Sequence, residues 1–112
     1  MHSPQNIFTG IKPTPGTEQF LTLFESDEVT IERIVSCSVS SPDGFWYDQD
    51  HDEWVIVLKG AARLQFSEGE TVDLNAGDHL LIPIHQQHRV QSTSEETIWL
   101  AVRVKSKPVT PC

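Results

Sequence analysis

The chain has 112 residues, of which 38% are apolar and 21% charged, as expected for one folded domain rather than a disordered chain. Sixteen acidic residues against eight basic ones give a net charge of −8, which argues against nucleic acid and against an anionic membrane surface as partners. The longest apolar run, from Trp54 to Leu58, is too short to span a bilayer. The N-terminus lacks the basic and apolar parts of a secretory signal, so we expect a cytoplasmic protein.

Prolines and glycines in residues 1–18 predict an irregular N-terminal arm. Beyond it, short β-like segments alternate with turn residues, and no window carries a sustained helical period. The predicted strands cover residues 19–24, 29–39, 54–58, 61–66, 71–74, 80–83, 88–92 and 97–104. Their length and even spacing predict an all-β sandwich or barrel over residues 19–105, followed by a loose C-terminal tail at 106–112.

Two of these segments indicate which strand faces are covered. The segment 54–58 is apolar on both faces, which is typical of a strand covered on both sides, as in a double-layered barrel or at a dimer contact. In 97–104, Trp99, Ala101 and Arg103 share one face. We expect Arg103 to point outward at the barrel rim; the alternative is an interior Arg103 that pairs with Glu53 or with an acidic ligand.

The candidate site depends on Glu53 and His88, which border segments that read as buried strands. Glu53 lies two residues before Val55, so the two side chains share a face, and Glu53 points into the barrel if Val55 does. A buried carboxylate needs a cation, a metal ion or a raised pKa. His88 begins a predicted strand soon after Pro83. We therefore expect the two side chains to converge inside the barrel.

These turns and spacings resemble the cupin superfamily, whose small members are single-domain jelly-roll β-barrels. The first cupin motif ends in a Glu followed seven residues later by a Gly, and Glu53 and Gly60 match it. The Gly, Pro and His of the second motif fall on Gly77, Pro83 and His88. The resemblance covers roughly residues 29–104. It extends to a subgroup of small bacterial cupins that carry the segments 46–49 (Trp-Tyr-Asp-Gln) and 52–54 (Asp-Glu-Trp).

A typical cupin holds Fe, Mn, Ni or Zn with three His and one Glu, and here the resemblance is incomplete. The two His of the first motif fall on Tyr47 and Gln49, or, with the longer spacing, on Trp46 and Asp48. In the second motif, His85 replaces a Gly and Ser92 replaces an Asn.

By register, the resemblance retains Glu53 and His88 as ligands. Gln49 could add an amide oxygen, or Asp48 a carboxylate if the longer spacing holds. Gln49, Glu53 and His88 would then form a three-ligand oxygen and nitrogen set, weaker than a His-rich one.

Three hypotheses about function follow. The first is a divalent metal (Fe, Mn, Ni or Zn) with a small organic molecule in the barrel mouth, in an oxidoreductase or isomerase where Tyr47 or His51 moves a proton. The second is a metal-free pocket that binds a small ligand through Tyr47, Gln49, Glu53 and His88 without catalysis. The third is a structural module. We also expect a homodimer, because segment 54–58 needs cover on both faces.

Overall fold

The computed structural model describes residues 2–105, and every regular element in that range is a β-strand. The strands are β1 (Thr17–Glu25), β2 (Val29–Cys37), β3 (His51–Lys59), β4 (Ala61–Phe66), β5 (Thr71–Asn75), β6 (His79–Ile82), β7 (His88–Thr93) and β8 (Thr97–Lys105). The all-β prediction is confirmed. The first strand begins at Thr17 rather than at residue 19. The tail predicted at 106–112 lies outside the described residues.

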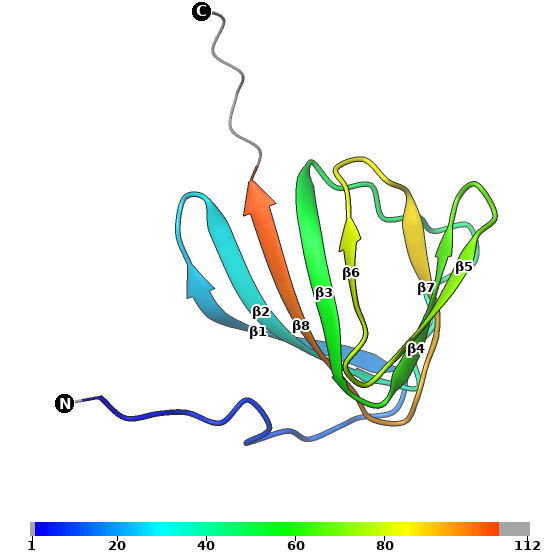
Figure 1. The fold of residues 1–112 in the computed structure, drawn as a ribbon. Coiled ribbons are helices and arrows are strands. Elements are labelled where there is room, and N and C mark those ends of the chain that lie inside the picture. The colour runs from blue at the N-terminus through cyan, green and yellow to red at the C-terminus, as the bar shows by residue number, and fades with distance from the viewer. Residues whose placement is uncertain (1, 106–112) are drawn as a thin grey trace, which may run out of the picture.

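The strands form two antiparallel sheets, one of five strands in the order β1-β2-β8-β3-β6 and one of three in the order β5-β4-β7. Figure 1 shows the sheets facing each other, close together where β3 turns into β4 and further apart toward the start of β3. This is a jelly-roll β-barrel, as predicted. No helix in residues 2–105 is long and apolar enough to cross a membrane.

Alternation along β3 explains how one strand serves both the core and the outer surface. Glu53, Val55 and Val57 are buried, whereas the residues between them are half-buried. The inward-facing side chains of both sheets form one core, made of Ile34, Val55, Val57, Ala62, Leu64, Phe66, Leu74, Ile82, Val90, Trp99 and Ala101. The segment predicted to be covered on both faces therefore has its inner face in this core, and its outer face is only partly covered.

Gly60 makes the turn that carries the chain from β3 in the large sheet to β4 in the small one. Its backbone has φ of +85°, in the left-handed region that side chains disfavour. A Cβ at this position would also collide with the carbonyl oxygen of Glu96 and lie 2.6 Å from Ser94 Oγ. Gly60 is thus required by both conformation and space.

Candidate functional site

A cavity of about 180 Å³ lies between the two sheets. Its polar lining consists of Glu18, Tyr47, Gln49, Glu53, His88 and Arg103. The apolar lining comes from core residues of both sheets, among them Leu64 and Trp99, together with the exposed Phe20 of β1. The convergence of Glu53 and His88 that the sequence predicts is therefore present, and Tyr47 and Gln49 line the same space.

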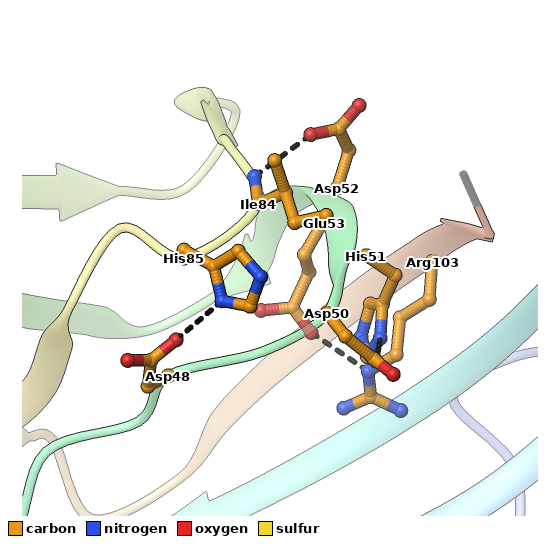
Figure 2. A network of polar contacts seen from close by, with 8 residues as sticks. All are labelled: Asp48, Asp50, His51, Asp52, Glu53, Ile84, His85 and Arg103. Carbon is orange, nitrogen blue, oxygen red and sulfur yellow. Dashed lines mark hydrogen bonds and ion pairs between the residues drawn. The ribbon is translucent and has the colours of Figure 1, made fainter. Parts of the chain in front are cut away.

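Arg103 is the cation that accompanies the buried Glu53. The two residues are register partners on β8 and β3, and Arg103 Nε donates a hydrogen bond to Glu53 Oε2 at 3.0 Å (Figure 2). Arg103 Nη1 donates to Glu32 Oε1 at 2.8 Å, and the two glutamates are only 6% (Glu53) and 8% (Glu32) exposed. The cluster thus holds two buried carboxylates around one guanidinium.

The expected outward direction of Arg103 was wrong. Arg103 lies on the same face of β8 as Trp99 and Ala101, and that face turns out to be the inner one. Hydrogen bonds to both Glu32 and Glu53 offset the desolvation of the guanidinium, which explains why a cation is tolerated there.

Tyr47 and His88 are held together by their backbones as well as by their rings. Tyr47 N–H donates to the His88 carbonyl at 2.7 Å, and His88 N–H donates back to the Tyr47 carbonyl at 3.1 Å. The rings stack with centroids 5.3 Å apart and planes 24° apart. His88 Nδ1 donates to the Gln86 carbonyl at 2.9 Å, because a carbonyl can only accept. Among residues 2–105, no hydrogen bond reaches the other ring nitrogen, Nε2.

The phenol of Tyr47 is held in its neutral form. Burial raises its pKa above the ordinary 10.0, and the negative charges of Glu18 and Glu53 raise it further, while Arg103 acts in the opposite direction. At neutral pH Tyr47 therefore carries an O–H that can donate a hydrogen bond into the cavity.

A second network ties residues 48–52, where β3 begins, to the segment before β7, at the edge of the site (Figure 2). His85 N–H donates to the Gln49 carbonyl at 2.8 Å, His85 Nδ1 contacts Asp48 Oδ1 at 2.8 Å, and the Ile84 N–H donates to Asp52 Oδ1 at 2.8 Å. The hydrogen bond from His85 lowers the pKa of the Asp48 carboxyl. These contacts fix the backbone that presents Tyr47 and Gln49.

His85 also has φ of +60°, the left-handed conformation that explains a glycine at this position of the cupin motif. It is exposed and does not line the cavity, so it positions the surrounding loops.

His51, predicted as one of two proton-moving residues, is the first residue of β3. Its ring Nδ1 lies 3.2 Å from Asp50 Oδ1, and it does not line the cavity (Figure 2). A role for His51 stays a prediction, and so does the catalytic role of Tyr47, although Tyr47 does line the cavity.

Sequence reasoning missed two carboxylates, Glu18 and Glu32. Ser36 Oγ donates to Glu18 Oε2 at 2.6 Å, and Trp99 Nε1 donates to Ser36 Oγ at 3.1 Å, so Glu18 is linked to the core. The signal for Glu32 was present, since it lies two residues before the core residue Ile34 and shares its face, just as Glu53 precedes Val55.

The predicted metal ligands Gln49, Glu53 and His88 all line one cavity, but their surroundings do not suit a resident metal ion. One oxygen of the Glu53 carboxylate already accepts a hydrogen bond from Arg103 at 3.0 Å, so that oxygen is engaged and is not free to coordinate a metal ion. Within residues 2–105, no group of three His, Cys, Asp or Glu side chains is placed to hold a metal ion. Metal binding by this set stays a prediction, with the position of Arg103 against it.

An all-β jelly-roll barrel with a polar site between its sheets defines the class of this protein. Residues 42–103 match the family model of the cupin domain, and the chain belongs to the cupin family. The resemblance read from Glu53, Gly60, Gly77, Pro83 and His88 is thus confirmed.

Two solved structures show how far the similarity extends. A candidate mannose-6-phosphate isomerase from Ralstonia eutropha JMP134 is 37% identical and superposes with a TM-score of 0.88, over 94% of this chain and 100% of that one. A cupin superfamily protein from Desulfitobacterium hafniense DCB-2 is 20% identical with a TM-score of 0.80, over 95% and 94% of the two chains. The second similarity shows the fold alone.

Two curated relatives are similar over shorter stretches. An uncharacterized protein of Aquifex aeolicus (strain VF5) is 32% identical over 92 residues, or 82% of this chain. The uncharacterized protein YdbB of Bacillus subtilis (strain 168) is 37% identical over 70 residues, or 62% of this chain. The chain spans only 63% and 61% of the length of these two relatives.

Proposed function

We propose that the protein binds a small organic molecule directly in the cavity between its sheets, without a resident metal ion. The observation that carries this proposal is the buried pair of Glu53 with Arg103 at 3.0 Å, inside a cavity of about 180 Å³. Arg103 supplies the positive charge that the resemblance assigns to a metal. An apolar cavity with a few converging polar groups is the usual form of a small-molecule site.

Each polar residue of the cavity can contribute a distinct contact. The neutral phenol of Tyr47 can donate a hydrogen bond, His88 Nε2 can contact a ligand, and the Gln49 amide can both donate and accept. Among the described residues, no hydrogen bond reaches Oε1 of Glu53, so this oxygen is left to accept one. The apolar lining would enclose the body of the molecule.

The name of the Ralstonia eutropha neighbour raises the question of whether this chain isomerises a sugar phosphate. A phosphate group is usually held by cationic side chains or by free backbone N–H groups. Among residues 2–105, Arg103 is the one Lys or Arg side chain that lines this cavity, and it already binds Glu32 and Glu53. We therefore propose ligand binding, and we expect mannose 6-phosphate not to bind.

Thermal-shift screening of a metabolite library in the presence of a chelator tests the proposal. The expected result is a set of compounds that raise the Tm of the wild type and of His79→Ala, but not of His88→Ala. His79 is an exposed histidine of β6 that does not line the cavity, so it is the matched control. Shifts that need added metal, or that persist unchanged in His88→Ala, would contradict the proposal.

We also propose that two copies pair through the outer face of the five-stranded sheet. Trp54 is the register partner of Val102 and of Leu81, and Ile56 is the partner of Leu100, so these apolar side chains form one continuous outer face. The edge strand β1, which β2 separates from β8, also exposes apolar side chains at Leu21, Leu23 and Phe24. An edge strand that presents apolar side chains is a typical site of association.

A further inference from the structure

We infer that the cavity selects a small organic cation, an ammonium carried on an apolar body, over neutral and anionic molecules of the same shape. This inference rests on the proposed function and names the ligand class that the same site would accept. The carboxylates around the cavity, its aromatic lining and its volume support it separately.

The first support is the balance of charge. Glu18 and Glu53 line the cavity, and Glu32 accepts a hydrogen bond from Arg103 without lining it, so three carboxylates accompany one guanidinium in and beside the cavity. The positive charge of Arg103 is already shared by two of them, through hydrogen bonds of 2.8 and 3.0 Å. What remains for a ligand is a net negative environment, and the interior of the barrel screens it less than water does.

The pKa of Tyr47 is raised by the same excess of negative charge. Glu18 and Glu53 come from different strands, β1 and β3, yet both raise the pKa of this phenol, and the opposing effect of Arg103 is the smallest of the named causes. Both carboxylates are therefore within electrostatic reach of one point in the cavity.

The hydrogen-bonding capacity of the carboxylates of Glu18 and Glu53 also favours a cation. Among residues 2–105, Glu18 and Glu53 each have one carboxylate oxygen engaged, by Ser36 and Arg103 respectively, and no hydrogen bond reaches the other oxygen. Each can therefore accept a hydrogen bond from an ammonium group, and such charge-assisted bonds are the stronger kind.

The walls of the cavity suit the rest of such a molecule. Phe20, Tyr47 and Trp99 bring aromatic rings to the lining, and the faces of aromatic rings attract ammonium groups. The volume of about 180 Å³ is slightly larger than the cavities of roughly 150 Å³ that accept benzene. A six-membered ring with one or two further heavy atoms would fit.

Three probes of nearly equal shape test the inference: benzylamine as the cation, benzyl alcohol as the neutral molecule and benzoate as the anion. Each is titrated at neutral pH into the full chain by calorimetry, and NMR of the indole N–H of Trp99 reports whether the probe enters the cavity. We expect benzylamine to bind about tenfold more tightly than benzyl alcohol, and benzoate to bind most weakly.

Variants assign the preference to the carboxylates. Glu18→Gln and Glu53→Gln should each lower the affinity for benzylamine about tenfold and leave that for benzyl alcohol unchanged. Glu25→Gln, at the exposed end of β1, should change neither affinity. Because Glu18 is partly exposed, its variant keeps the test valid even if Glu53→Gln does not fold.

The outcomes separate the two proposals. If benzyl alcohol or benzoate binds as tightly as benzylamine, or if neither carboxylate variant alters the preference, the inference is overturned and the ligand-binding pocket stands. If no probe binds and the Trp99 signal stays unchanged, the inference is overturned as well, whereas the ligand-binding pocket is decided separately by the metabolite screen in chelator.

Discussion

Arg103 determines how the buried carboxylates of this barrel are tolerated. Its guanidinium binds both Glu32 and Glu53, each less than a tenth exposed. Removing one partner of a buried ion pair is costly because the other charge stays buried and unpaired. The stability of the site should therefore depend on Arg103 more than on either glutamate.

We expect Arg103→Met to lower the free energy of unfolding by about 3–5 kcal/mol at neutral pH, because it leaves two buried carboxylates without their cation. Glu53→Gln should cost less, because Arg103 keeps its hydrogen bond to Glu32. Chemical denaturation followed by tryptophan fluorescence measures both losses.

The control for this prediction is Arg63→Met, which removes a solvent-exposed ion pair with Asp73 and should change the free energy of unfolding far less. Equal losses for Arg63→Met and Arg103→Met would show that the Arg103 pairs are not buried as described.

The titration of Tyr47 reports on the charges around the cavity, and it can be measured without overlap because Tyr47 is the single tyrosine of the chain. The ultraviolet absorbance of tyrosinate should titrate above pH 10, since burial and the charges of Glu18 and Glu53 raise the pKa of Tyr47. A raised folded-state pKa means that its contribution to stability is complete below pH 10 and is lost as the pH rises through the folded value.

Substitutions should move this titration in opposite directions. Glu53→Gln removes a charge that raises the pKa of Tyr47 and should lower it, whereas Arg103→Met removes a charge that lowers it and should raise it. An unshifted wild-type titration, or shifts of the wrong sign in the variants, would refute the described surroundings of Tyr47.

At the scale of the elements, the strands themselves were predictable from sequence. Turn residues and alternation placed all eight segments, and the segment 61–66 coincides with β4. The side of Glu53 was also predictable, because Val55 anchors the inner face of β3.

The inward direction of Arg103 was not predictable, because β8 is apolar on both faces and only its pairing with β2 and β3 decides which one is inside. The hydrogen bond from Arg103 to Glu32 joins residues 71 apart in the chain, which no local pattern encodes.

The turn at Gly60 provides a test of how the two sheets are joined. Gly60→Ala should lower the free energy of unfolding by more than the roughly 1–3 kcal/mol expected from backbone strain alone, because the new Cβ also collides with Glu96. Gly69→Ala is the matched control, since Gly69 has φ of +105° but no atom within 4 Å of its would-be Cβ. If both variants lose the same stability, the close approach at Gly60 is not real.

At the scale of the whole molecule, we expect the apolar outer face of the five-stranded sheet to be buried against a second copy in a dimer. We expect light scattering at micromolar concentration to give the mass of a dimer, and Val102→Glu to give a monomer because it places a charge in the middle of that face. Gln91→Glu, on an exposed position of β7, should remain dimeric. A monomeric wild type would remove the proposed interface.

The proposed function as a whole depends on Arg103, rather than a metal ion, neutralising Glu53 inside the barrel. Elemental analysis of protein purified without a chelator, before and after incubation with Fe, Mn, Ni or Zn salts, measures this most directly. We predict a metal content far below one ion per chain in both samples. A content close to one ion per chain, retained after desalting, would contradict direct binding of the organic ligand and would restore Gln49, Glu53 and His88 as metal ligands.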